Sequence, residues 1–256
     1  MGEQENIHRA RLYSALSMGF DRPDEELLWA INEGSFAEAV SASASALDDD
    51  IEEAASALEE ALPTEASELR SAYAAAFGNE NESTVSQYET GYAPGTLVTN
   101  TNQLADMAGF YRAFGLDIAA GRRDRADYLS TQLEFAGHLA AQRAYLEEEG
   151  DETGAEVVTD ARASFIEDHL GRWVPRFVAE VREEVDEPFY RTLSNLLGAL
   201  VENENEVLAI SPAEFEAEPT APLESLPGME RDEEGRLATS CGAMASPEPQ
   251  QSEVDR

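Results

Sequence analysis

The sequence predicts an all-α protein, with a single helical-bundle domain over residues 1–210 and a disordered acidic tail over residues 211–256. Apolar residues recur at the three- and four-residue spacing of amphipathic helices along most of the first part. No segment alternates polar and apolar residues for long enough to build a sheet. In the last part, prolines, acids and serines replace the helical pattern, a composition typical of disordered chain.

The first 62 residues are expected to form four packing helices. Pro23 lies in the first turn of the second helix, acids follow near the positive end of the helix dipole, and Gly34 ends it. The next two helices are rich in alanine, whose small side chain allows close approach of neighbouring helices. The expected helices cover residues 7–19, 23–34, 36–47 and 50–62.

Two helices and two loops are expected before the middle of the chain. The first helix ends at Gly78 and is followed by a loop at residues 79–86. The second helix ends at Gly115. Residues 121–125 then form an exposed basic linker, the only net-positive patch of the sequence.

A long helix over residues 127–149 is expected at the centre of the bundle. It carries two apolar lines and therefore buries a wide face. Asp127 is expected to be its N-cap. Gly171 and Pro175 are expected to break or kink the helical stretch that follows, and Pro188 opens the last helix.

Charge is the most pronounced feature of the composition. The 53 acidic and 17 basic residues give a formal net charge of -36, and every basic residue is arginine. Such a surface repels nucleic acid and destabilises a compact fold by self-repulsion in dilute salt. At about 1 M ionic strength the screening length falls to about 3 Å, which removes most of that cost. We therefore predict a halophilic protein that does not bind nucleic acid.

The compartment is predicted from what the sequence lacks. No stretch reaches the roughly 18 uncharged apolar residues of a membrane-spanning helix, and the N-terminal residues are polar and acidic, unlike a secretory signal. The single cysteine, Cys241, lies in the tail and excludes a disulfide framework. A cytoplasmic protein without stable membrane insertion is expected.

Recognised motifs of catalysis and cofactor binding are absent from the sequence. No HExxH, CxxC, P-loop or GxSxG pattern occurs, and three histidines, His8, His138 and His169, are few for a metal site. Carboxylate pairs occur on every helix and carry no information about acid–base chemistry. We expect no enzyme activity, no cofactor and no metal.

Seven residues near element ends are candidates for binding a partner. Loop aromatics and polar groups at helix ends either fill seams between helices or contact a ligand, and both readings stay open here. His169 and Trp173 lie four residues apart, on one helical face, where a buried pair is the simpler interpretation. The candidates are Tyr88, Glu89, Tyr92, Asp127, Tyr128, His169 and Trp173.

Several spaced stretches match one family pattern. Tyr88-Glu89-Thr90 stands where that family has Tyr-Glu-Ser. The family's Pro-Asp-His-Leu corresponds to Ala126-Asp127-Tyr128-Leu129, so this chain has alanine in place of the proline and tyrosine in place of the histidine. The other stretches are residues 104–115 (LADMAGFYRAFG), Leu133-Glu134-Phe135, Phe165, His169-Leu170, Trp173, Pro175, Phe177, and Phe189-Tyr190 with Leu193. Together, over roughly residues 69–200, they resemble the TorD/DmsD/NarJ family of chaperones for molybdenum-cofactor enzymes.

The resemblance implies a TorD-like helical fold and a dedicated cytoplasmic chaperone, acting as a monomer or a helix-exchanged dimer. Its expected partner is the twin-arginine leader, or the apo form, of a molybdopterin oxidoreductase catalytic subunit of the dimethyl sulfoxide reductase type. The chaperone would assist cofactor insertion and delay export. Glu89 and Asp127 would accept the leader's guanidinium groups, and the aromatic candidates would line a groove for its apolar part.

Two other functions stay open. An assembly adaptor would dock on a folded redox complex and read no leader. A nucleotide-dependent enzyme has the least support, because no phosphate-binding glycine loop occurs.

The composition predicts that stability rises with salt. The melting temperature is expected to increase from dilute buffer to molar KCl, because screening removes repulsion among the acidic groups. Thermal unfolding followed by circular dichroism measures the shift. Equal melting temperatures in the two buffers would contradict a halophilic protein.

Overall fold

The computed structural model describes residues 2–63, 66–78, 85–93, 97–118, 125–213, 215, 229–231 and 237–239. It divides the chain into two units, Met1–Glu216 and Ala217–Arg256. All the elements described in the first unit are helices, which confirms the all-α prediction. None of the described helices is long and apolar enough to cross a membrane.

The segment predicted to be a disordered tail contains described structure. Two strands, β1 (Met229–Arg231) and β2 (Leu237–Thr239), pair antiparallel, contrary to the expectation that no strands form. Three residues are too few to show an alternating pattern in the sequence. Phe215, also within the predicted tail, is buried in the first unit beneath the Arg172 guanidinium, 4.1 Å from the ring centroid. Cys241 and most of the tail lie outside the described residues, where disorder stays a prediction.

The first half of the domain forms more helices than predicted. The expected helix over residues 50–62 is divided at Ala57, whose φ of -80° and ψ of -6° depart from regular helical values. The helices are α1 (Glu3–Phe20), α2 (Glu25–Asn32), α3 (Ser35–Ala44), α4 (Asp49–Ser56), α5 (Leu58–Ala61) and α6 (Ala66–Phe77).

In the second half, the structure departs from the break or kink that was expected at Gly171 and Pro175. The chain does not break at Gly171 and Pro175, because a π-helical turn joins two helices there and a new hydrogen-bond register starts. Pro175 is the fifth residue of the next helix and lies inside it, and the helix continues through the proline. The elements are η1 (Glu89–Gly91), α7 (Leu97–Ala113), α8 (Leu129–Glu148), α9 (Glu152–Phe165), η2 (Ile166–Leu170), α10 (Gly171–Glu184) and α11 (Pro188–Val207).

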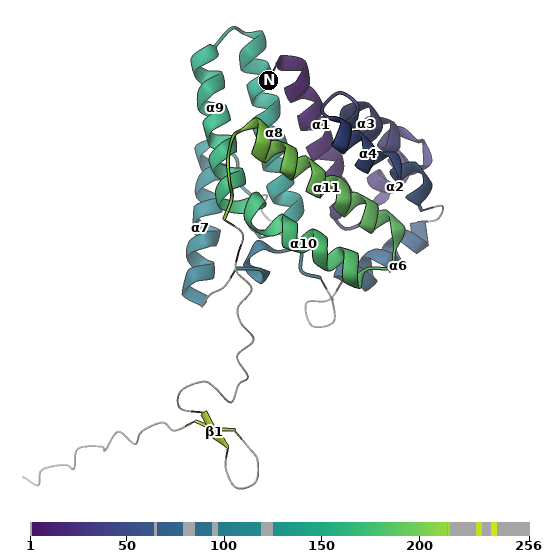
Figure 1. The fold of residues 1–256 in the computed structure, drawn as a ribbon, viewed down its shortest axis with the longest axis vertical. Helices are drawn as coiled ribbons and strands as arrows, with labels where there is room; N and C mark the ends of the chain where they lie inside the picture. The colour runs from purple at the N-terminus through teal and green to yellow at the C-terminus, as the bar shows by residue number, and fades with distance from the viewer. Residues whose placement is uncertain are drawn as a thin grey trace, which may run out of the picture. The chain divides into compact units, whose positions relative to one another are not determined.

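The predicted central helix is α8, which lies between α1 and α9 (Figure 1). Small residues allow α1 to approach it closely: a Cβ atom on Gly137 would lie 3.0 Å from Cβ of Tyr13. Nearby, the Ser17 and Ser130 hydroxyls are 2.9 Å apart across the same seam. Helix α11 packs on α10 and α4 and crosses the bundle, closing the core.

A buried ionic cluster connects the first helix to the last. The fully buried Arg9 of α1 donates to Glu204 of α11, which is also fully buried, over 3.2 Å. Arg162 of α9 lies 3.5 Å from the other oxygen of Glu204 and donates to Asn6. Burial, with the Glu204 carboxylate beside it, raises the pKa of the Tyr13 phenol. The cluster therefore ties three helices together at one carboxylate.

Substituting Arg9→Met is expected to lower the free energy of unfolding by about 3 kcal/mol, because it removes one partner of a buried ion pair. The matched control is Arg11→Met, on the same helix but exposed, which should change it by less than about 0.5 kcal/mol. Urea unfolding in molar KCl measures both. Equal losses would show that the buried cluster contributes no more than surface charge.

Candidate functional site

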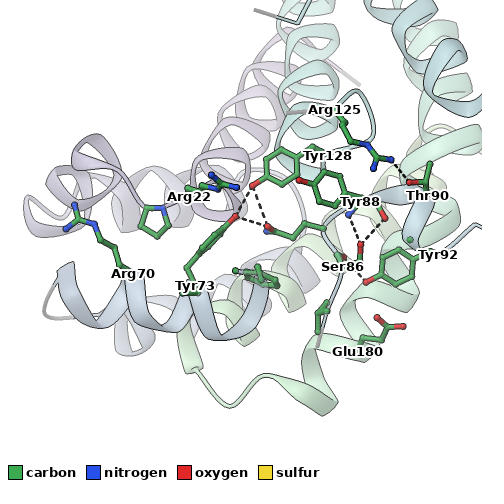
Figure 2. A pocket seen from close by; sticks show the side chains of 17 residues that line it. Arg22, Arg70, Tyr73, Ser86, Tyr88, Thr90, Tyr92, Arg125, Tyr128 and Glu180 are labelled. Atoms are coloured by element: carbon green, nitrogen blue, oxygen red, sulfur yellow. Dashed lines mark hydrogen bonds between the residues drawn. The ribbon is translucent and has the colours of Figure 1, made fainter. Parts of the chain in front are cut away.

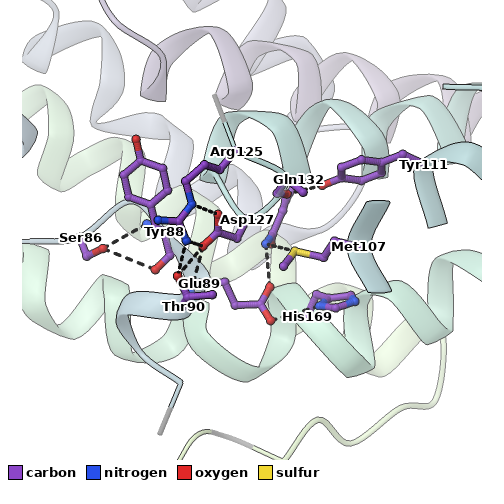
Figure 3. A network of polar contacts seen from close by, with 11 residues as sticks. Ser86, Tyr88, Glu89, Thr90, Met107, Tyr111, Arg125, Asp127, Gln132 and His169 are labelled. Carbon is purple, nitrogen blue, oxygen red and sulfur yellow. Dashed lines mark hydrogen bonds and ion pairs between the residues drawn. The ribbon is translucent and has the colours of Figure 1, made fainter. Parts of the chain in front are cut away.

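The candidate site starts from a short backbone pairing between two distant segments. The Glu89 N–H donates to the Asp127 carbonyl at 3.0 Å, and the Leu129 N–H donates to the Gln87 carbonyl at 2.9 Å. Tyr88 and Tyr128 thus form an isolated antiparallel bridge, with their rings 5.4 Å apart. The pairing holds η1 against the start of α8 and brings the predicted Tyr88–Glu89 and Asp127–Tyr128 motifs together (Figure 3).

On the inner side of η1, the buried Glu89 carboxylate is the centre of a polar network. Gln132 of α8 donates to one of its oxygens at 2.7 Å, and Nδ1 of His169 lies 3.1 Å from the other. The side-chain oxygen of Gln132 in turn accepts a hydrogen bond from Trp173 Nε1 at 3.2 Å. Three of the seven predicted residues, Glu89, His169 and Trp173, therefore belong to one network. Gln132 connects Glu89 to Trp173, and Glu89 connects Gln132 to His169.

On the other side of η1, the Asp127 carboxylate lies in a polar corner. Arg125 donates to both of its oxygens, from Nε at 2.9 Å and from a terminal nitrogen at 2.8 Å. The Thr90 hydroxyl donates to the same carboxylate at 2.6 Å and accepts from Arg125 at 2.7 Å. The guanidinium of Arg125 also covers the Tyr88 ring, 5.1 Å from its centroid. We call Tyr88, Thr90 and Asp127 the guanidinium corner.

Tyr92 and Tyr128 take part in the packing beneath this surface. Tyr92 stacks on Trp173 with a centroid distance of 5.2 Å. Burial raises the pKa of the Tyr92 phenol, with Glu180 adding to the shift, so the phenol stays neutral and donates to the Ser86 carbonyl at 2.9 Å. The Tyr128 hydroxyl points inward, 3.0 Å from the Tyr73 hydroxyl.

Helix α7 covers the Glu89 network. The sulfur of its buried Met107 accepts from Gln132 at 3.2 Å, and Asp106 lies 3.5 Å from Nε2 of His169. Burial raises the pKa of the Tyr111 phenol, which donates to the Ala126 carbonyl at 2.7 Å. The run at residues 104–115 thus supplies a cover for the site as well as core packing.

A pocket of about 650 Å³ opens beside the guanidinium corner (Figure 2). Aromatic rings from α6, from the two residues that flank η1, and from the N-cap of α8 line it. At one end stand Arg22 and Arg70, and at the other Thr90, Tyr92 and Glu180. The complete lining is Arg22, Pro23, Arg70, Tyr73, Ala74, Phe77, Gly78, Val85, Ser86, Gln87, Tyr88, Thr90, Gly91, Tyr92, Arg125, Tyr128 and Glu180.

The structure corrects two expectations about the candidate residues. Asp127 is not the N-cap of the central helix: Tyr128 occupies that position, and the Asp127 carboxylate instead accepts from the Thr90 N–H at 3.3 Å. Glu89, Asp127 and Tyr128 were expected to be reachable by a partner but are buried. Gln132 takes up the Glu89 carboxylate, Arg125 covers that of Asp127, and the Tyr73 hydroxyl contacts that of Tyr128. Tyr88 is half-buried and lines the pocket. Binding by any of the seven stays a prediction.

Three residues of the site are not among those that the sequence singles out. Gln132 is a polar residue among the apolar positions of the central helix, and that mismatch is the available signal. Arg125 falls in the predicted exposed linker, whose residues 121–124 lie outside the described part. Thr90 enters the family pattern only as a replacement for serine. Within the part of the chain described, no group of three or more His, Cys, Asp or Glu residues is placed to hold a metal ion.

Comparison with known proteins identifies the family. Residues 44–179, more than half of the chain, match the model of the nitrate reductase delta subunit. The perchlorate reductase assembly chaperone protein of Dechloromonas aromatica is 27% identical over 205 residues, covering 77% of this chain and 88% of the relative.

Two further relatives match shorter stretches. The selenate reductase assembly chaperone protein of Thauera selenatis is 31% identical over 131 residues, 51% of this chain and 65% of that protein. The chaperone protein TorD of Photobacterium profundum is 26% identical over 127 residues, 50% of this chain and 57% of that protein. The chain therefore belongs to the nitrate reductase delta subunit family, the family of TorD-like chaperones that its sequence resembles.

Proposed function

We propose that this protein is a cytoplasmic assembly chaperone for the catalytic subunit of a molybdopterin oxidoreductase of the dimethyl sulfoxide reductase type. It binds the subunit's twin-arginine leader, assists cofactor insertion and delays export. Family membership and relatives named as reductase assembly chaperones support the chaperone role. The observation that carries the leader-binding part is the aromatic pocket beside a carboxylate that already holds a guanidinium group.

The chemistry of the pocket suits a leader with a basic pair followed by an apolar stretch. Carboxylates accept the two parallel N–H donors of an arginine, and tyrosine faces attract the same cation. Tyr73, Phe77 and Val85 offer apolar surface along the rest of the pocket. At high salt, long-range attraction is weak, so affinity depends on these short-range contacts.

The charges at the two ends of the pocket give the leader a direction. Arg22 and Arg70 are both exposed and would repel an arginine pair. The opposite end offers the half-buried Glu180, which pairs with Arg176 at 3.2 Å, and the buried Asp127 lies there behind Arg125. The arginine pair therefore lies at the Asp127 end, and the apolar stretch runs toward Arg22.

Leader binding is expected to depend on the Tyr88 ring. In molar KCl, Tyr88→Ala should weaken binding of a synthetic client leader about tenfold, because the variant loses both an aromatic wall and a cation–π face. Isothermal titration calorimetry measures the affinity. Tyr145→Ala is the matched control, since Tyr145 is an exposed tyrosine of α8 away from the pocket. Absence of binding by the unmodified protein, or equal losses in the two variants, would contradict the proposal.

The alternative function, an adaptor that docks on a folded redox complex, predicts a different result when the leader is deleted. A leader-reading chaperone should lose most of its client in co-purification, because the arginine pair and the apolar stretch are both removed. An adaptor should retain the client unchanged. Quantifying the client recovered with the tagged chaperone, with and without its leader, separates the two functions.

A further inference from the structure

Arg125 occupies the guanidinium corner in the way that an arginine of a partner would. Its Nε and one terminal nitrogen donate to the two oxygens of Asp127, the fork geometry that carboxylates offer to arginine. The same guanidinium donates to the Thr90 hydroxyl and lies over the Tyr88 ring. The three residues of the corner are therefore all engaged by one side chain (Figure 3).

The exposure of the two charged groups shows which one covers the other. The Asp127 side chain is 0% exposed, whereas the Arg125 side chain is 43% exposed. Arg125 is thus the outer layer of the corner, between the carboxylate and solvent. Arg9 and Glu204 differ in this respect, because both side chains of that pair are 0% exposed.

Replacement of Arg125 by another guanidinium leaves every interaction of the corner intact. Asp127 keeps its two donors, Thr90 keeps its donor, and Tyr88 keeps a cation over its ring. Leaving Asp127 without a cation is unfavourable, because a carboxylate withdrawn from water needs a partner. A lysine ammonium supplies one point charge and cannot reproduce the fork. The corner therefore favours exchange of arginine for arginine.

We propose that Tyr88, Thr90 and Asp127 form a guanidinium-binding site that Arg125 fills in the free chaperone and an arginine of the client leader fills in the complex. The exchange rests on the proposed leader-binding function, whereas the guanidinium site stands on the geometry alone. Arg125 acts as an internal competitor and lowers the apparent affinity in proportion to its occupancy. It also makes binding selective for arginine.

The first experiment tests the guanidinium site without any leader. Agmatine, a four-carbon amine that carries a guanidinium group, is titrated in molar KCl into Arg125→Ala and into the unmodified protein. Putrescine, which has an ammonium group in place of the guanidinium, is the control. Agmatine should raise the melting temperature of Arg125→Ala in the millimolar range, while putrescine should not, and the unmodified protein should need about ten times as much agmatine for the same rise. An equal response of both proteins, or no response of Arg125→Ala, would overturn the site.

The second experiment tests the exchange. Arg125→Gln should bind the arginine leader about tenfold more tightly than the unmodified protein, as expected when a competitor that is nine-tenths bound is removed. A leader with lysines in place of its arginines should bind both proteins equally. Arg182→Gln, which removes a charge from an exposed position outside the corner, should leave both affinities unchanged.

The outcomes separate the two proposals. If Arg125→Gln binds both leaders equally tightly, or binds the arginine leader no better than Arg182→Gln does, Arg125 is no competitor and the exchange is wrong. If no variant binds any leader while agmatine still stabilises Arg125→Ala, the leader-binding function is wrong and the guanidinium site remains. Melting curves verify folding. Arg125→Lys, which keeps the charge but not the fork, replaces any variant that does not fold, and agmatine should stabilise it at lower concentrations than it stabilises the unmodified protein.

Discussion

The backbone pairing between residues 87–89 and 127–129 is the constraint on which the whole site depends. Tyr88, with φ of -119° and ψ of 129°, is extended, so its side chain and that of the next residue point to opposite sides of the backbone. Tyr88 therefore faces the pocket while Glu89 faces the core. The same pairing fixes Asp127 beside η1 rather than at the end of α8. Two short motifs, 37 residues apart at Thr90 and Asp127, become one surface in this way.

Buried carboxylates carry the specific interactions of this very acidic chain. Among the acidic residues that the structure describes, Glu89, Asp127 and Glu204 have fully buried side chains, and each is held by named donors. Salt screens exposed charges strongly and buried pairs much less. In the halophilic protein that the composition predicts, surface acids would provide solvation, while position and selectivity would come from the few acids that are withdrawn from solvent.

The sequence predicted the elements better than the contacts between them. Helical periodicity predicted that the central helix starts at residue 127, two residues before its observed start at Leu129. The prediction is close because the burial of apolar side chains sets that periodicity. The π-helical turn at Ile166–Leu170 has no comparable signature, since one extra residue per turn does not disturb a short apolar run. The composition also made the site hard to predict. Because acidic residues occur on every helix, nothing in the sequence distinguished the buried Glu89 and Asp127 from exposed acids. Their partners Gln132 and Arg125 become evident only when distant segments meet.

The positive charges of the pocket bear directly on how a basic leader enters it. Three arginines line the pocket, and adding a further pair would bring like charges together. The proposed exchange at the guanidinium corner would avoid part of this cost, because one arginine would leave the carboxylate as another arrives and the charge there would be conserved. Arg22 and Arg70 then oppose a reversed leader, in which the basic pair would lie at their end. In the proposed complex, the same residues that weaken binding overall would therefore fix its direction and its selectivity, a combination that suits a chaperone dedicated to one client.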